Sequence, residues 1–178
     1  MLGAVQGGVT LKGLSADTLQ GDAAILGILR RCGAELSVTD EGIRLGKAPL
    51  HGTDIDLADC PDLGPVLMVL GLFCEGTTTI RNAERLRIKE SDRAAAMAQE
   101  LAKFGAQVTV EEDRVTVLPR PLHAPNEELD GHNDHRIAMM AAVCAASAGA
   151  PVKLLGAECV RKSYPEFWTH FQSLGGDL

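Results

Sequence analysis

The sequence has few aromatic side chains: they make up 3% of its 178 residues, although 46% of the residues are hydrophobic. A core built from this sequence must therefore consist mainly of aliphatic residues and alanine, which suits closely packed helices and sheets. A chain of this length can form one domain that buries about 70% of its unfolded surface. We therefore expect a single domain over residues 1–178.

An excess of positive charge is also missing. Lys and Arg number 17 against 24 Asp and Glu, which gives a formal net charge of −7. Nucleic acids and anionic membrane surfaces attract positively charged proteins, so a general role in binding either of them is excluded. Any anion site must therefore be a local cluster of cations that acts against the overall field.

The sequence contains no long apolar run, no signal peptide, no CxxC motif and no metal-ligand spacing of its histidines. The five cysteines are an odd number and are best explained as buried free thiols in a reducing cytoplasm. His132 and His135 are three residues apart, but Asn133 and Asp134 between them resemble a helix cap. We therefore expect a cytoplasmic protein without a metal site.

Hydrophobic patterns and turn residues predict alternating strands and helices. Residues 66–73 are apolar on all sides, so their helix should be buried. Ser15 and Asp17 offer caps for one helix, and Ser163 with Glu166 matches a capping box for the last. Strands are expected over 9–14, 50–57, 77–80 and 152–155, hairpins over 34–45 and 107–117, and helices over 19–31, 62–73, 92–104, 137–148 and from 161 onward.

This order of elements repeats after about seventy residues. Lys89 and Lys162 keep the register of the repeat, because each follows a glycine by thirteen residues. The repeating unit is strand, helix, strand, helix, hairpin. The chain starts in mid-unit, without the apolar helix that should precede Val9. We therefore expect one domain of a longer protein with an artificial start at Met1; a short protein with a degenerate first unit is the alternative.

Charge is concentrated between Arg81 and Arg93, where five cations and three carboxylates occupy thirteen residues. A solvated loop with surface ion pairs would explain such a run by itself. However, its last five residues form one of four charged helix starts that the repeat should bring to one face. Helix N-termini present unpaired N–H groups, and cations beside them favour phosphate or carboxylate ligands. The four starts are Asp62, Lys89–Arg93, Asn133–Arg136 and Arg161–Ser163.

Each of these residues also has a purely structural interpretation. Asp62 and Asp134 would be ordinary N-caps, Arg93 and Arg136 would form surface ion pairs, and Glu90 would only neutralise the lysine before it. The mixture of charges favours a chemical role instead. Carboxylates beside several cations stay ionised, yet they can exchange protons with a bound substrate.

Three motifs, Arg87–Arg93, Asn133–Arg136 and Lys162–Pro165, resemble the C-terminal half of the 5-enolpyruvylshikimate-3-phosphate synthase family. Pro61-Asp62 and Gly76–Thr78 fit the same pattern, and the resemblance covers essentially the whole chain. It implies an α/β (α+β) fold in which each of two domains consists of three βαβαββ units. The parallel helices of both domains point to the cleft between them, an arrangement described as an inside-out α/β barrel.

The resemblance implies transfer of the enolpyruvyl group of phosphoenolpyruvate to the 5-hydroxyl of shikimate 3-phosphate, a step of the shikimate pathway to aromatic amino acids. It also implies that phosphate is released and that no cofactor or metal is needed. By position, Asp62 resembles the carboxylate that contacts the shikimate hydroxyls and assists proton transfer, and Glu90 resembles the acid beside the phosphoenolpyruvate methylene. Lys89 resembles a residue on the shikimate 3-phosphate side. The phosphoenolpyruvate clamp, where glyphosate would compete, corresponds to Arg93, Arg136 and Lys162.

Two departures from the family pattern stand out. Arg85 occupies a position where some members have an asparagine near the 3-phosphate. The N-terminal domain, which contacts both substrates, is expected to be missing, so the fragment should fold without catalysing turnover alone. UDP-N-acetylglucosamine enolpyruvyl transferase is one alternative, and a non-catalytic anion-binding or interaction module is another. The motifs Lys89–Arg93 and Asn133–Arg136 favour the shikimate enzyme.

Overall fold

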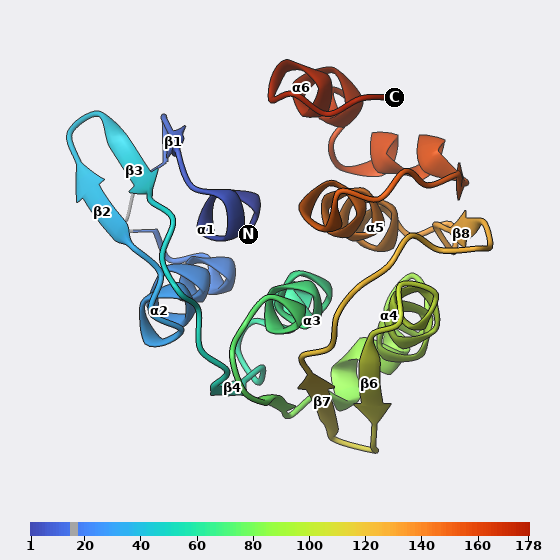
Figure 1. The fold of residues 1–178 in the computed structure, drawn as a ribbon. Helices are drawn as coiled ribbons and strands as arrows, with labels where there is room; N and C mark the ends of the chain where they lie inside the picture. The colour runs from blue at the N-terminus through green and yellow to red at the C-terminus, as the bar shows by residue number, and fades with distance from the viewer. Residues whose placement is uncertain (15–17) are drawn as a thin grey trace.

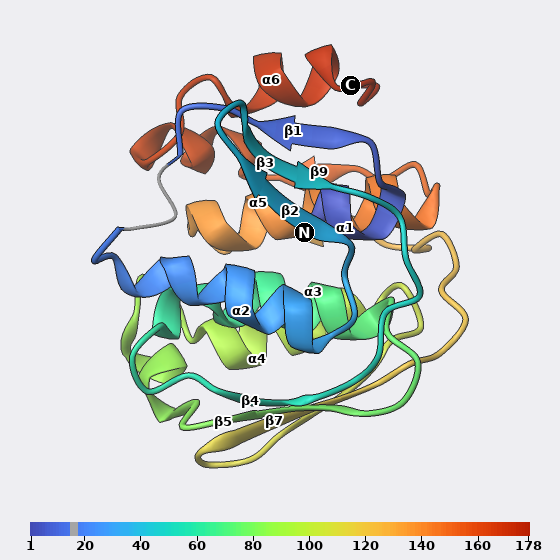
Figure 2. The same cartoon turned by 90° about the vertical axis from the view of Figure 1, so that its left-hand side faces the viewer.

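The structure, a computed structural model, describes residues 1–14 and 18–178, so the predicted caps Ser15 and Asp17 lie outside the described residues. Figure 1 views the helices nearly end-on, with the strands around them, and in Figure 2 the longer helices run roughly along one direction. The α-helices of the described part are α1 (Leu2–Gln6), α2 (Ala24–Arg31), α3 (Gly64–Leu72), α4 (Arg93–Ala102), α5 (His135–Ala148) and α6 (Phe167–Ser173). Its 3-10 helices are η1 (Gly21–Ala23), η2 (Pro61–Leu63), η3 (Glu84–Ile88) and η4 (Ala157–Lys162).

The strands form three separate sheets in the described part of the chain. The first is antiparallel, with the order β1 (Val9–Leu11), β3 (Gly42–Leu45), β2 (Leu36–Thr39). The second has the order β4 (Asp54–Asp56), β5 (Thr78–Arg81), β7 (Arg114–Leu118), β6 (Gln107–Val110); its β4 and β5 are parallel and its other pairs antiparallel. The third pairs β8 (Leu129–Asp130) with β9 (Leu154–Leu155) in parallel.

The predicted repeat is present in the order of these elements. The middle unit is complete, with β4, α3, β5, α4 and the hairpin β6–β7 following one another. The segment β8, α5, β9 repeats the parallel crossover of β4, α3, β5. A 3-10 helix follows β5 and another follows β9; Lys89 comes directly after η3, and Lys162 ends η4. The two lysines therefore lie at the ends of corresponding 3-10 helices, which agrees with the predicted register to within one residue.

Helix α3 lies at the centre of the core. All of its residues except Val66 are buried, as predicted, because apolar residues occur on every side of the helix. It contacts α4 and α5, and all three helices contribute to a large buried cluster made mainly of aliphatic residues and alanine. A smaller cluster joins α5 and η4 to α6 through Cys159, Val160, Phe167 and Phe171, with Trp168 at its edge. No helix in the described ranges is long and apolar enough to cross a membrane.

Both ends of the chain differ from the predictions. A five-residue helix, α1, stands before Val9, where the sequence pattern indicated that a helix was absent, and its Ala4 is fully buried. The capping box of Ser163 and Glu166 is wrong, because η4 extends to Lys162 and α6 begins only at Phe167. Glu166 therefore occupies the N-cap position itself, without a side-chain cap hydrogen bond. The strands expected over 9–14 and 152–155 shorten to 9–11 and 154–155.

Candidate active site

The four predicted helix starts meet at one end of the core helices. Arg93, the first residue of α4, places its Nη1 2.9 Å from Asp62 Oδ1 in η2 and its Nε 2.8 Å from Asp134 Oδ2, at the start of α5. Lys162, from η4, donates to the main-chain carbonyl of Asn133. Residues that are far apart in the sequence thus form one charged cluster. The prediction that the four segments share one face is confirmed, but the fourth segment is not a helix start, because Lys162 ends η4.

Arg93 and Asp134 form the buried centre of the cluster, with side-chain exposures of 3% and 0%. Nε and Nη2 of Arg93 reach the two carboxylate oxygens at 2.8 and 3.3 Å. The Ser91 hydroxyl and the Arg136 N–H also donate to this carboxylate, at 3.0 and 2.9 Å. Burial alone would raise the pKa of Asp134, but the donors outweigh it and hold the pKa below its ordinary value. Asp134 is therefore an N-cap, as its position suggested, and also the counter-ion of a buried arginine.

Asp62 lies at the exposed side of the same cluster, with 36% of its side chain accessible. Besides Arg93, it meets Lys89 Nζ at 3.1 Å and Arg136 Nη2 at 3.2 Å. Burial opposes ionisation here too, but the hydrogen bond from Lys89 and the charges of the arginines lower the pKa of Asp62 below its ordinary value. The interpretation of Asp62 as an ordinary N-cap is wrong, because it lies inside η2, which has no side-chain cap.

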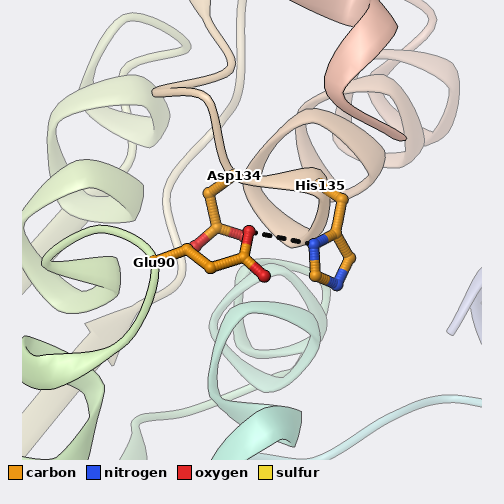
Figure 3. A group of neighbouring side chains, drawn as sticks. All are labelled: Glu90, Asp134 and His135. Carbon is orange, nitrogen blue, oxygen red and sulfur yellow. Dashed lines mark hydrogen bonds and ion pairs between the residues drawn. The ribbon is translucent and has the colours of Figure 1, made fainter. Parts of the chain in front are cut away.

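Glu90 lies between His135 and Lys162. Its Oε2 is 3.1 Å from His135 Nδ1 and 3.9 Å from Lys162 Nζ, and Figure 3 shows the histidine contact. Its ionic partners are thus these two residues rather than its neighbour Lys89, which pairs with Asp62. The side chains of Glu90 and Lys162 are 39% and 42% exposed. His135 was not predicted as a site residue, although its position directly after the cap residue could have indicated it.

Glu90, Asp134 and His135 also bring three potential metal-ligand atoms within 4.8 Å of one another (Figure 3). Both oxygens of Asp134 already accept hydrogen bonds, and the cation of Arg93 lies against them. A metal ion would have to displace a buried ion pair to use this carboxylate. The group is therefore better explained as part of the ion-pair network.

The first part of the charged run contacts other regions of the molecule. Arg81 Nε lies 2.7 Å from Asp54 in the neighbouring strand. Arg85 and Arg87 donate to the main-chain carbonyls of Ala58 and Glu111. Only the end of the run reaches the cluster, as the comparison of the repeats predicted.

The accessible rim of the cluster combines cations with carboxylates. Lys89 and Arg136 have side chains that are 24% and 28% exposed, and Lys162 is more accessible. Asp62 and Glu90 lie among them. Cations whose charge is already in place can bind phosphate or carboxylate groups, and ionised carboxylates beside them can move protons.

Comparison with known proteins shows the family of this chain. A family model described as EPSP synthase (3-phosphoshikimate 1-carboxyvinyltransferase) matches residues 1–171. Relatives named 3-phosphoshikimate 1-carboxyvinyltransferase from Clostridium kluyveri and Clostridium acetobutylicum are 44% and 43% identical over 100% and 99% of this chain. The chain spans 42% and 40% of the length of these two relatives.

Solved structures give the same result for the fold. An EPSP synthase from Acinetobacter baumannii matches with a TM-score of 0.83 and 26% identity, over 97% of this chain and 43% of that chain. The enolpyruvyl transferase NikO from Streptomyces tendae matches with a TM-score of 0.71 and 25% identity, over 88% of this chain and 36% of that chain. The predicted enolpyruvyl transferase fold is thereby confirmed. Because the family model spans nearly the whole sequence and the same fold recurs in these structures, the chain belongs to the EPSP synthase family.

Proposed function

We propose that this chain supplies part of the active site of a 3-phosphoshikimate 1-carboxyvinyltransferase in the cytoplasm. The enzyme would transfer the enolpyruvyl group of phosphoenolpyruvate to the 5-hydroxyl of shikimate 3-phosphate and release phosphate. The proposal depends above all on the cluster in which Asp62 and Glu90 lie among three accessible cations. Both substrates are anions, and the cluster offers them positive charge on a chain whose net charge is −7. The rest of the site would come from the N-terminal domain of the longer protein.

The proposed reaction needs two proton transfers at separate places. The methylene carbon of phosphoenolpyruvate gains a proton, while the 5-hydroxyl oxygen bonds to the adjacent carbon and loses its own proton. The bond from that carbon to the phosphate oxygen then breaks, and the methyl group loses a proton, which restores the double bond. Glu90 would exchange the proton at the methylene carbon, and Asp62 would take the proton of the hydroxyl. His135, 3.1 Å from Glu90, would orient this acid.

The cations would hold the two anions together and stabilise the departing phosphate. Lys89 would contact the 3-phosphate, whereas Arg136 and Lys162 would hold phosphoenolpyruvate. Arg93 is almost fully buried, so it would join this clamp by exchanging its contact with Asp62 for the substrate carboxylate. The same exchange would remove one donor from Asp62, which would keep Lys89 and Arg136, and would make this carboxylate a better acceptor for the hydroxyl proton.

A chimera tests this proposal. The matching part of the Clostridium kluyveri relative, 42% of its length, is replaced with this chain, and phosphate release is measured with both substrates. The chimera should release phosphate, and the 178-residue chain alone should not. A folded but inactive chimera, or turnover by the chain alone, would contradict the proposal. Release with UDP-N-acetylglucosamine in place of shikimate 3-phosphate would support the alternative acceptor.

Variants of the chimera test the assignment of residues. Glu90→Gln removes the proton donor, and we expect it to lower the rate by roughly 10²–10⁴-fold. Lys162→Met should raise the KM for phosphoenolpyruvate. The matched control is Lys153→Met, because Lys153 is an exposed lysine that pairs with Glu128 outside the cluster. Equal effects of the two lysine substitutions would contradict the assignment of Lys162.

A further inference from the structure

The segment before α5 has an unusual backbone. His132 and Asn133 adopt φ values of +49° and +50°, although neither is glycine. Left-handed conformations of this kind are uncommon for residues with a side chain, although Asn and His adopt them more often than most, and contacts with the surrounding structure stabilise them. Two in succession, directly before Asp134, therefore point to stabilising contacts next to the charged cluster.

Glu100 of α4 contacts both sides of this segment. Its Oε1 lies 3.0 Å from His132 Nε2, and its Oε2 accepts a hydrogen bond of 2.9 Å from the Asp130 N–H. Lys103 Nζ, 2.8 Å from Oε2, supplies a neutralising charge. The backbone N–H of His132 donates in turn to Asp130 Oδ1 at 2.7 Å. The carboxylate thus holds the residues before and after Gly131.

The position of Glu100 on α4 connects it to the cluster. Glu100 is 1% exposed and follows Arg93 by seven residues, which is two helical turns, so both side chains lie on one face of α4. Arg93 holds Asp134, and Glu100 holds His132. A buried carboxylate is costly unless it is paired, and an apolar residue would fill a core position of a helix at lower cost. A role in fixing the backbone accounts for the acid at this site.

This backbone places several groups of the cluster. The carbonyl of Asn133 accepts a hydrogen bond from Lys162, and Asp134 caps α5 through the Arg136 N–H. We infer that Glu100 is a positioning residue, which holds His132 in the left-handed conformation and thereby fixes Asp134 and the carbonyl that orients Lys162. The inference rests on the proposed function only for its effect on catalysis.

Hydrogen exchange on the 178-residue protein tests the positioning role without requiring activity. Glu100→Ala should accelerate exchange of the Arg136 and Asp134 amides by about tenfold or more, relative to the amides of α3, because the loop loses its anchor. Gln99→Ala, a change at the preceding residue of α4, is the matched control. It should change the exchange rates neither of the Arg136 and Asp134 amides nor of the α3 amides. Equal acceleration of all slow amides, or no change at Arg136, would overturn the inference.

A second substitution tests the conformational reason. Glycine adopts positive φ without a steric cost, so Glu100→Ala combined with His132→Gly should restore slow exchange at Arg136. Failure of this rescue would overturn the claim that Glu100 acts through the backbone of His132. If Glu100→Ala does not fold, Glu100→Gln replaces it, because glutamine keeps one acceptor oxygen. Glu100→Gln should accelerate exchange of the same amides by a smaller factor. An unchanged exchange rate at these amides would also overturn the inference.

The chimera separates this inference from the proposed function. In an active chimera, Glu100→Ala should raise the KM for phosphoenolpyruvate about tenfold, and His132→Gly should recover part of this loss. An unchanged KM would overturn the effect on substrate binding. If the unsubstituted chimera is inactive, the proposed function fails, but the exchange experiment still decides whether Glu100 positions the loop.

Discussion

Replacing Arg93 with methionine should reveal how strongly the buried ion pair holds the site together. Methionine keeps much of the length of the side chain but removes the charge and every hydrogen bond. The substitution leaves Asp134 without its cation, in a position where its side chain is 0% exposed. An unpaired buried carboxylate is among the most destabilising features in a protein interior. We therefore expect a large loss of stability at neutral pH.

The contacts set the size of this loss. Breaking a buried ion pair by removal of one partner typically costs about 3–5 kcal/mol. Asp134 would keep the donors from Ser91 and the Arg136 N–H, and Asp62 would keep Lys89. Because these donors remain, we expect a value near the low end, about 3 kcal/mol. The chain should still fold, since domains commonly have about 5–15 kcal/mol of stability.

The loss should also depend on pH. Without Arg93, burial becomes the dominant influence on Asp134, so its pKa should rise above the ordinary carboxyl value. A carboxyl group whose pKa is raised in the folded state loses its contribution to stability as pH rises through that pKa. The deficit of Arg93→Met should therefore be small near pH 4 and reach its full size near pH 7.

Urea unfolding followed by far-UV circular dichroism at several pH values measures this difference. The matched control is Arg81→Met, which removes an arginine from an aspartate pair of similar length, 2.7 Å, with side chains that are 48% and 59% exposed. That variant should unfold at nearly the same urea concentration as the unsubstituted protein. A loss below about 1 kcal/mol for Arg93→Met at pH 7, or one that does not vary with pH, would refute the reasoning.

Three further predictions concern the stability of the unsubstituted protein and its core. The hydrogen-bond donors lower the pKa values of Asp62 and Asp134 in the folded state, so the unfolded state takes up protons first on acidification. The contribution of these pairs to the free energy of unfolding should therefore be fully present above about pH 4–5 and decrease at lower pH. A urea midpoint that stays constant between about pH 5 and 3 would argue against these pairs. Leu67→Ala, at 0% exposure in α3, should cost about 2–5 kcal/mol in urea unfolding, whereas a cost below about 1 kcal/mol would place α3 outside the core. All five cysteines are buried, and burial raises the pKa of Cys144 to about 12. A thiol reagent should therefore label five thiols in urea and almost none in the native protein. Rapid labelling of the native protein would contradict this packing.

The sequence allowed prediction of the features that depend on local pattern or on the repeat. Helix α3 was predictable because its residues are apolar on every side. The glycines that end the helices were predictable too: Gly33 and Gly105 adopt φ values of +86° and +83°, which suit a left-handed C-terminal position. The register of Lys89 and Lys162 required the comparison of two units, since neither lysine is distinctive alone.

Features that depend on distant partners could not be predicted. Nothing near Arg93 indicates burial, because its partners Asp62 and Asp134 lie 31 and 41 residues away. Glu100 looks like an ordinary surface residue of a helix until the loop 130–132 is placed against it. Helix α1 was missed because five residues are too few to show a helical period.

The capping box was predicted wrongly for the opposite reason. The local sequence matches the motif, but contacts with the preceding residues prevent a helix from starting there. Residues 157–162 form the 3-10 helix η4, and the Tyr164 N–H donates to the carbonyl of Val160. This turn delays the start of α6 until Phe167. A short motif therefore predicted the correct helix but an incorrect first turn.

The smaller core cluster determines what fluorescence can report about this protein. Trp168 is the single tryptophan of the sequence, and its indole N–H donates to the carbonyl of Ala157, where η4 begins. Its emission therefore senses the docking of α6 and of the helix that carries Lys162, whereas circular dichroism averages over all helices. If the last unit detaches before the main core melts, the fluorescence transition will precede the circular dichroism transition. An unfolding curve recorded by fluorescence alone would then measure the stability of one end of the molecule.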